Sequence, residues 1–356
     1  MKKLLVGIGI VVLALIVAVG VFFWYSMQQP LYQPGMVRAG QNLRAPLAPA
    51  PQPAAEQNFW LVEDDIKLRH FADGTGRNVL VIHGGPGYPF AGPLPALKPL
   101  TNKYRFVYYD QRGSGQSSRP IAKFTSSNYY ENMTTLDKTL GLGAQIADIE
   151  RIRRILGEEK LVLVGHSFGA FLAALYAAEF PERVEALILI APADVLVMPA
   201  EDGGLYEEVK RVLPAELQKE YADYLTRYFD FGGIFSKSET ELVALNAEFG
   251  KYYALAAQAK GFRVPPESEI KNNGGWMMQA IFFSMGQRHD YRAALKPVAA
   301  PVLVIHGAND LQPEKASRNY ADAFPNARFQ PIANAGHFVF DDQPSEFARV
   351  VGEFLK

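Results

Sequence analysis

A serine between two glycines, in the run GHSFG at residues 165–169, is the feature of this sequence with the clearest chemical potential. A Gly-x-Ser-x-Gly run can place a serine hydroxyl on a sharp turn between a strand and a helix. Here the run follows the apolar stretch 161–164 and precedes a segment of helical composition from Phe168. We therefore predict that Ser167 is a nucleophile; the structural alternative is a turn whose serine only caps the helix.

A serine hydroxyl is a weak nucleophile and needs a base beside it. Of the six histidines, His337 lies in a loop between the strand-like segment 329–332 and the last helical segment. His166 adjoins Ser167 and would point away from it, and the others lie at strand ends, in an early strand-like region or near the end of a helical region (His70, His83, His289 and His306). We predict that His337 is the base; a purely structural loop histidine is the alternative.

The base needs a carboxylate that orients it and stabilises the imidazolium. Asp310 follows the apolar run 302–305 after a loop of several residues, and Asp194 follows the apolar run 186–190. We favour Asp310 because its loop lets it reach His337, and because the chain order Ser, Asp, His is the order expected when the serine lies on such a turn.

A tetrahedral intermediate also needs two backbone N–H donors for its oxyanion. Phe168, directly after the nucleophile, supplies one of them in this prediction. The run HGGPG at residues 83–87 follows the apolar stretch 79–82, and its glycines allow a close approach of the backbone to a substrate. We expect Gly85 to supply the second donor; a merely tight turn would need glycine but not this whole run.

The elements that must position these residues can be recognised from their patterns. Five short runs are apolar on both faces, as in central strands of a parallel sheet covered by helices: 79–82, 105–109, 161–164, 186–190 and 302–305. Helical segments lie between and after them, at 144–156, 168–180 and 344–355. This alternation predicts an α/β fold with a doubly wound, mostly parallel sheet.

The alternation is interrupted between residues 195 and 295, where amphipathic segments such as 207–213 and 239–259 predominate. We predict a core of residues 58–194 and 296–356, and a helical cap of residues 195–295. An insertion at that edge would lie over the carboxyl ends of the strands, where open α/β sheets bind ligands.

Four motifs together resemble the proline iminopeptidase branch of the α/β-hydrolases: HGGPG at 83–87, DQRGSGQS at 110–117, NMTT at 132–135 and GHSFG at 165–169. The resemblance covers about residues 58–195 and 300–356. It implies an α/β-hydrolase fold and a serine aminopeptidase that removes an N-terminal residue, often proline, from short peptides. It applies equally to amidases and esterases that share the core and act on small acyl substrates.

The resemblance is weakest in the cap. Family aminopeptidases hold the free α-amino group of the substrate with cap carboxylates, which implies such a role for Glu248 and Glu207, with Glu201 and Glu208 as further candidates. Solvated acids on a lid helix are the alternative for each of them. The stretch 136–143 is an addition that could reshape the mouth of the pocket.

Composition excludes several other functions. The net charge is −1, without a basic run, so the chain offers no field for nucleic acid. It has no cysteine, so disulfides, thiolate metal sites and a cysteine nucleophile are excluded. We expect no metal and no organic cofactor, and a small molecule or short peptide as substrate. A non-catalytic binding protein on the same fold would be expected to lack a triad or oxyanion residue, and none is missing.

The N-terminus predicts a membrane anchor. Lys2 and Lys3 precede 22 uncharged residues, 4–25, which as a helix would be about 33 Å long, enough to cross a bilayer core of about 30 Å. The lysines favour a cytoplasmic N-terminus and an extracytoplasmic catalytic domain. The alternative is a signal peptide cleaved after Gly20, with secretion. Residues 26–57, rich in proline, are expected to form an extended spacer that does not pack, so residues 1–25 would be an anchor and 26–57 a linker.

Overall fold

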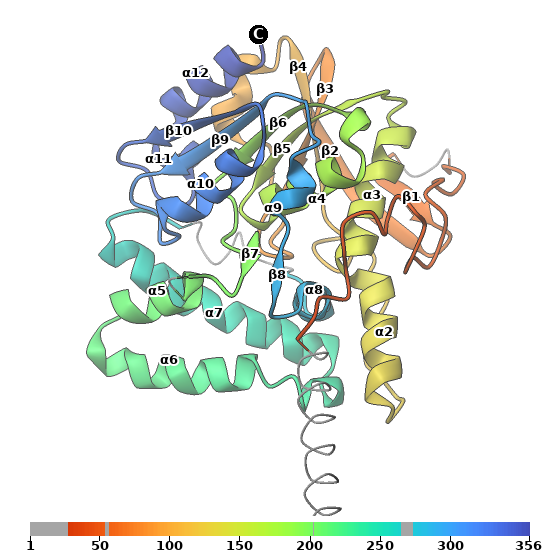
Figure 1. Cartoon of the computed structure of the whole chain (residues 1–356), viewed down its shortest axis with the longest axis vertical. Coiled ribbons are helices and arrows are strands. Elements are labelled where there is room, and N and C mark those ends of the chain that lie inside the picture. Colours follow the sequence, from red (N-terminus) through yellow and green to blue (C-terminus); the bar gives the residue numbers. More distant parts are fainter. Residues whose placement is uncertain (1–27, 54–56, 202, 265–272) are drawn as a thin grey trace, which may run out of the picture.

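The computed structural model describes residues 28–53, 57–201, 203–264 and 273–356. Its centre is an eight-stranded sheet with the order β1-β2-β4-β3-β5-β6-β9-β10 (Figure 1). The first two pairs are antiparallel and the other pairs are parallel. The strands are β1 (Phe59–Glu63), β2 (Ile66–Gly74), β3 (Arg77–Ile82), β4 (Tyr104–Tyr109), β5 (Leu161–His166), β6 (Val184–Ile190), β9 (Val302–Gly307) and β10 (Ala327–Ile332). The mostly parallel sheet predicted from the five apolar runs is thus confirmed.

Helices cover both faces of this sheet, which is why its strands are apolar on both sides. Leu80 and Ile82 of β3 belong to the core under one helical layer, whereas Val79 and Val81 belong to the core under the other. The first layer contains α3 (Leu142–Ile155), α4 (Phe168–Glu179), α9 (Arg292–Leu295) and α10 (Glu314–Ala323), with the turn η2 (Pro181–Arg183) after α4. The second contains η1 (Pro95–Leu100), α11 (Val339–Asp342) and α12 (Pro344–Phe354).

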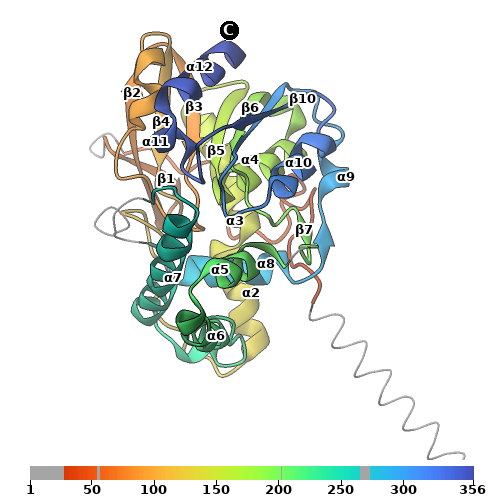
Figure 2. The ribbon, with the colours of Figure 1, turned by 90° about the vertical axis from the view of Figure 1, so that its left-hand side faces the viewer.

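The chain between β6 and β9 forms a helical layer, which lies beyond one end of the strands of the sheet (Figures 1 and 2). It consists of α5 (Gly204–Val212), α6 (Ala215–Tyr228), η3 (Ile234–Ser236), α7 (Glu239–Ala259) and α8 (Trp276–Met285). A short antiparallel ladder of β7 (Val197–Met198) and β8 (His289–Asp290) joins its two ends. The added stretch 136–143 falls largely within α2 (Tyr129–Leu140), which packs along α8.

The expectation that residues 26–57 form a spacer that does not pack is wrong for much of the described part. Tyr32 and Val37 are buried in the main core. The Glu179 carboxylate at the end of α4 accepts hydrogen bonds from the Tyr32 hydroxyl (2.9 Å) and from the backbone N–H groups of Gly35 (2.8 Å) and Arg38 (2.9 Å). Proline content predicted extended backbone, but it could not reveal that a buried carboxylate binds this segment.

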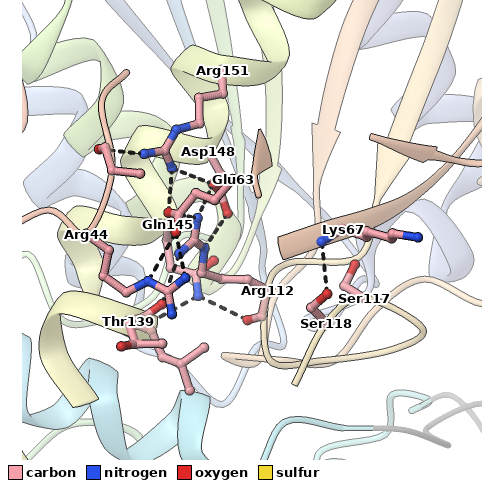
Figure 3. Close-up of polar contacts among 12 residues, drawn as sticks. Arg44, Glu63, Lys67, Arg112, Ser117, Ser118, Thr139, Gln145, Asp148 and Arg151 are labelled. Carbon is pink, nitrogen blue, oxygen red and sulfur yellow. Dashed lines mark hydrogen bonds and ion pairs between the residues drawn. The ribbon is translucent and has the colours of Figure 1, made fainter. Parts of the chain in front are cut away.

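The carboxyl part of the same segment lies over a buried ionic network (Figure 3). The Arg112 guanidinium donates to both carboxylate oxygens of Asp148 (2.6 and 2.5 Å) and to Glu63 (2.7 Å). Arg151 donates to Asp148 and to Glu63 at 3.0 Å each. All four side chains are nearly inaccessible, and Arg44 pairs with Glu63 from the N-terminal segment (3.0 Å). The network therefore joins the sheet edge, α3 and residues 28–53.

The predicted anchor, residues 4–25, lies outside the described residues. Within the part of the chain that is described, no helix is both long and apolar enough to cross a membrane.

Candidate active site

Ser167 occupies the turn between β5 and α4. Its backbone has φ 54° and ψ −120°, a region that a residue with a side chain adopts only when its surroundings enforce it. A Cβ on Gly165 would overlap the carbonyl oxygen of Gly169, and one on Gly169 would overlap that of Ile82. Both flanking positions therefore require glycine, and the turn presents Ser167 at the carboxyl ends of the parallel strands.

Asp310 and His337 form a buried pair beside this turn. Asp310 lies in the loop after β9 and His337 in the loop after β10, and Nδ1 of His337 is 2.8 Å from Oδ2 of Asp310. The other oxygen of Asp310 accepts from the backbone N–H of Gln312 (3.0 Å). Burial acts to raise the pKa of the Asp310 carboxyl, but the charge of His337 and these hydrogen bonds outweigh it and lower the pKa. The carboxylate is thus ionised and can orient an imidazole.

The competing acid is placed differently. Asp194 follows β6, and its backbone N–H donates to the side-chain oxygen of Gln312 (2.6 Å). It is Asp310, not Asp194, that bonds to His337.

His166 fixes the position of the His337 loop, a role that its sequence context did not predict. Its Nε2–H donates to the backbone carbonyl of His337 (2.9 Å), and the two rings lie 4.8 Å apart. Because a carbonyl oxygen only accepts, the tautomer of His166 is set by this bond. His166 directly precedes Ser167, so the bond ties the His337 loop to the Ser167 turn.

The glycine loop after β3 meets the same turn. A Cβ on Gly84 would lie 2.9 Å from the Cβ of Ser167, so glycine is needed for this approach, and Gly85 has φ 116°. His83 braces the loop: its Nε2 accepts from the backbone N–H of Gln111 (3.0 Å), and its Nδ1–H donates to the Gly84 carbonyl (2.9 Å). Gly85, the expected oxyanion donor, thus lies in a loop held against Ser167.

One face of α7, a helix of the cap, packs against the His337 loop. The Tyr253 ring meets the His337 ring edge to face at 6.1 Å. Asn246, two turns earlier, donates to the Gly274 carbonyl (2.6 Å), and the N–H of Gly274 donates to the Gly87 carbonyl (2.9 Å). The Tyr253 hydroxyl and the Asn246 side-chain oxygen are buried without a hydrogen-bond partner among the described residues. Sequence reasoning missed both, although their spacing of seven places them on one helical face.

The cap carboxylates expected to bind substrate lie elsewhere. Glu248 is two residues from Asn246, hence on another face of α7, and pairs with Arg227 of α6 (2.7 Å). Glu207 is exposed on the first turn of α5, and Glu201 pairs with Lys315 at the surface. The orientation of these three does not support the predicted binding role.

Of the four acidic candidates, Glu208 is connected to the Asp310 loop, through Lys260. It binds Lys260 (3.1 Å), whose ammonium also donates to the backbone carbonyl of Asp310 (3.2 Å). Among the described residues, no group of three or more His, Cys, Asp or Glu side chains could hold a metal ion.

The buried histidines give the fold a predicted acid sensitivity. Burial, then the charge of His337, lowers the pKa of His166 to about 3, and burial lowers that of His83 to about 4. Unfolded histidine titrates near pH 6.5, so below about pH 6.5 the unfolded chain binds protons that the folded chain does not. We expect the free energy of unfolding to fall as the pH falls from 6.5 towards 4, by up to about 1.4 kcal/mol per pH unit for each histidine.

Urea unfolding between pH 4 and 7 measures this dependence. The variant His166→Gln should show a shallower decline than the parent chain over the same range. Equal slopes for the two proteins would contradict the assignment of a buried neutral imidazole to His166.

Comparison with known proteins gives a consistent result. The model of the alpha/beta hydrolase fold family matches residues 77–344. The proline iminopeptidase of Neisseria gonorrhoeae is 30% identical over 75% of this chain and 84% of its own length, and that of Heyndrickxia coagulans is 26% identical over 80% and 92%. A solved thermophilic esterase from Thermogutta terrifontis shares the fold, with a TM-score of 0.52 and 22% identity over 82% of this chain and 93% of its own.

Proposed function

Because the chain belongs to the α/β-hydrolase fold family, we propose that Ser167, His337 and Asp310 are a catalytic triad that cleaves an amide or ester bond through an acyl-enzyme. One observation carries the proposal: His337 and Asp310 form a buried hydrogen bond of 2.8 Å. His166, the residue before Ser167, binds the backbone carbonyl of His337 and so holds this pair beside the Ser167 turn.

The steps follow the chemistry of such triads. His337 takes the proton of the Ser167 hydroxyl while the serine oxygen attacks the carbonyl carbon. The N–H groups of Gly85 and Phe168 stabilise the oxyanion. His337 then gives the proton to the leaving group, which departs. Water, activated by the same histidine, hydrolyses the acyl-enzyme and restores Ser167, while Asp310 orients the imidazole throughout.

For the substrate, we propose release of an N-terminal residue, proline or a similar one, from a short peptide. The support is the similarity to enzymes named proline iminopeptidase over most of this chain and most of theirs. Since the acyl-enzyme forms on the N-terminal residue, such a substrate brings a free amine into the site between Ser167 and the cap.

One observation favours a second candidate, a carboxylesterase or amidase for small acyl substrates. A buried ammonium group needs a carboxylate or several carbonyl oxygens beside it. The face of α7 that meets His337 carries Asn246 and Tyr253, whereas Glu248 is paired with Arg227 on another face. Neutral polar groups suit an uncharged acyl chain.

A matched set of chromogenic substrates separates the two candidates. Prolyl and alanyl anilides with a free amine would be compared with the same anilides acetylated on nitrogen, and with short acyl esters. An aminopeptidase turns over only the free-amine compounds, and preference for the acetylated compounds or esters would assign the second function. No turnover of any compound by the folded protein would count against both.

Tyr253 gives a finer test of substrate contact. If its buried hydroxyl binds the substrate, Tyr253→Phe should lower kcat/KM by about 3- to 10-fold, the effect of one neutral hydrogen bond. The loss should be carried mainly by KM. Tyr130→Phe, which removes an exposed hydroxyl, is the matched control and should change neither kcat nor KM. Equal kcat/KM values for Tyr253→Phe and the parent chain would show that the Tyr253 hydroxyl does not bind the substrate and that the ring only packs in the cap.

For location, we propose that residues 4–25 anchor the chain in a membrane and that the catalytic domain is extracytoplasmic. The length of the uncharged stretch and the position of Lys2 and Lys3 support this. Retention in the membrane fraction after an alkaline carbonate wash is the expected result. A mature chain that begins after Gly20 would instead indicate cleavage and secretion.

A further inference from the structure

Aromatic side chains from three elements gather at one end of the cap. They are Tyr129 and Tyr130 at the start of α2, Phe229 and Phe231 after α6, and Phe282 and Phe283 in α8, and we refer to these six residues as the cap-end surface. Tyr130 (69% exposed) and Phe229 (36%) are the large hydrophobic side chains most exposed in the described part of the chain. The apolar interior of the cap therefore reaches the solvent here.

Five of the six rings are in mutual contact, and Tyr130 directly follows one of them, Tyr129, in α2. The Phe231 ring lies 6.0 Å from that of Phe282 and 5.4 Å from that of Phe283, and Phe229 lies 5.6 Å from Phe282. The Tyr129 hydroxyl donates to the backbone carbonyl of Phe231 (3.0 Å), which joins α2 to the turn after α6. In both views this end is opposite the C-terminus (Figures 1 and 2).

The first described residues are fixed beside this surface. The Gln28 carbonyl accepts from the backbone N–H groups of Gln287 (2.9 Å) and Arg288 (3.2 Å), and its side-chain oxygen accepts from Arg288 (2.7 Å). Gly286 ends α8 against Gln28: a Cβ on it would lie 2.7 Å from the Gln28 carbonyl oxygen. The last turn of α8, with Phe282 and Phe283, is therefore the place where residues 28–53 join the body.

Chain length then limits where a bilayer can lie. Tyr25 ends the uncharged stretch and is three residues from Gln28, which corresponds to about 10 Å of fully extended chain at most. Because residues 28–53 pack on the body, they cannot lengthen this connection. An anchor in residues 4–25 would hold the end of α8 at the membrane rather than at the end of a spacer.

We infer that the cap-end surface rests on the lipid bilayer, with its tyrosine and phenylalanine rings at the level of the headgroups. The inference rests on the proposed anchor. Aromatic side chains with an apolar body favour this region of a membrane, and tyrosine adds a polar tip that stays hydrated. We therefore take the partner of the cap-end surface to be phospholipid rather than a protein, because the short connection at Gln28 brings this end of the cap to the bilayer.

The absence of native cysteine allows a direct test by spin labelling of the full chain in phosphatidylcholine–phosphatidylglycerol vesicles. Single labels are placed at Tyr130→Cys, Phe229→Cys and, as a control at the opposite end, Lys356→Cys. We expect collisions with a water-soluble nickel reagent to be severalfold fewer at 130 and 229 than at 356, and collisions with oxygen to be more frequent.

The outcomes separate the inference from the proposals on which it rests. Carbonate extraction and N-terminal sequencing of the same samples test the anchor, and turnover of the labelled chains tests the hydrolase. An anchored, active chain whose labels at 130 and 229 are as accessible as the label at 356 overturns the inference alone. A processed chain that begins after Gly20 overturns the anchor and the inference together. Shielding that appears only at high protein density assigns the surface to a second copy of the chain, and this also overturns the inference.

Discussion

Replacing Ser167 by alanine should lower kcat by about 10⁶-fold while the fold persists, because no other group in a triad can form the acyl-enzyme. The substitution removes one oxygen and keeps Cβ, so the backbone of the turn and its packing against Gly84 are unchanged. The measurement is turnover of the best substrate of the chromogenic set, with circular dichroism and Tm as checks of folding.

The acid can be tested in the same assay with a matched pair. Asp310→Asn should reduce kcat by about 10⁴-fold, since an amide favours the wrong tautomer of the base. Asp194→Asn, which leaves the His337 contact intact, should have little effect. Substantial activity in Ser167→Ala, or equal losses in the two aspartate variants, would refute the proposed triad. A protein that uses the fold only for binding would show no turnover either in the parent chain or in Ser167→Ala.

The second large effect concerns stability. Asp148→Ala should reduce the free energy of unfolding by about 3–5 kcal/mol, because it leaves the guanidinium groups of Arg112 and Arg151 buried with less negative charge beside them. Asp148 accepts from both guanidinium groups at 2.5–3.0 Å, and all of these side chains are nearly inaccessible.

A surface pair is the natural control. Glu346 pairs with Arg349 on the exposed side of α12, and Glu346→Ala should leave the free energy of unfolding close to that of the parent chain, because solvent screens this pair. Urea or guanidinium unfolding of both variants compares the two settings directly. A loss below about 1 kcal/mol in Asp148→Ala would mean that water enters the network and screens it.

The network also explains part of the motif that suggested the family. Within residues 110–117, Arg112 binds Asp148 and Glu63, and the N–H of Gln111 bonds to His83, which braces the glycine loop. Gln111 thus supports the glycine loop through His83, and Arg112 belongs to the buried ionic network. Residues without an evident chemical role can therefore carry a family resemblance.

The sheet was predictable because it leaves local signals in the sequence, and signals of the same kind suggested the residues of the proposed triad. A strand covered on both faces carries an unbroken apolar run of four or more residues, as in β3, β5, β6 and β9, and the sharp turn at Ser167 needs glycine on both sides. Chain order then selected Asp310 and His337. Each of these inferences depends on neighbours in sequence or on the order of the elements.

The cap and the N-terminal segment were less predictable because partners distant in sequence decide their structure. Glu248 turns towards Arg227, and Tyr253, five residues later, turns towards His337; only the packing of α7 between α6 and the core distinguishes the two. Likewise, the proline content of residues 26–57 describes the backbone but not the Glu179 carboxylate that receives it.

That carboxylate determines how the protein can be shortened for expression. A recombinant version that starts at Asn58, where the pattern of the sequence becomes globular, would remove Tyr32 and Val37 from the core and leave Glu179 buried without its backbone donors. Since α4 runs from Phe168 to Glu179, the damage would reach the helix that begins directly after Ser167. A trimmed enzyme should therefore start at or before Gln28.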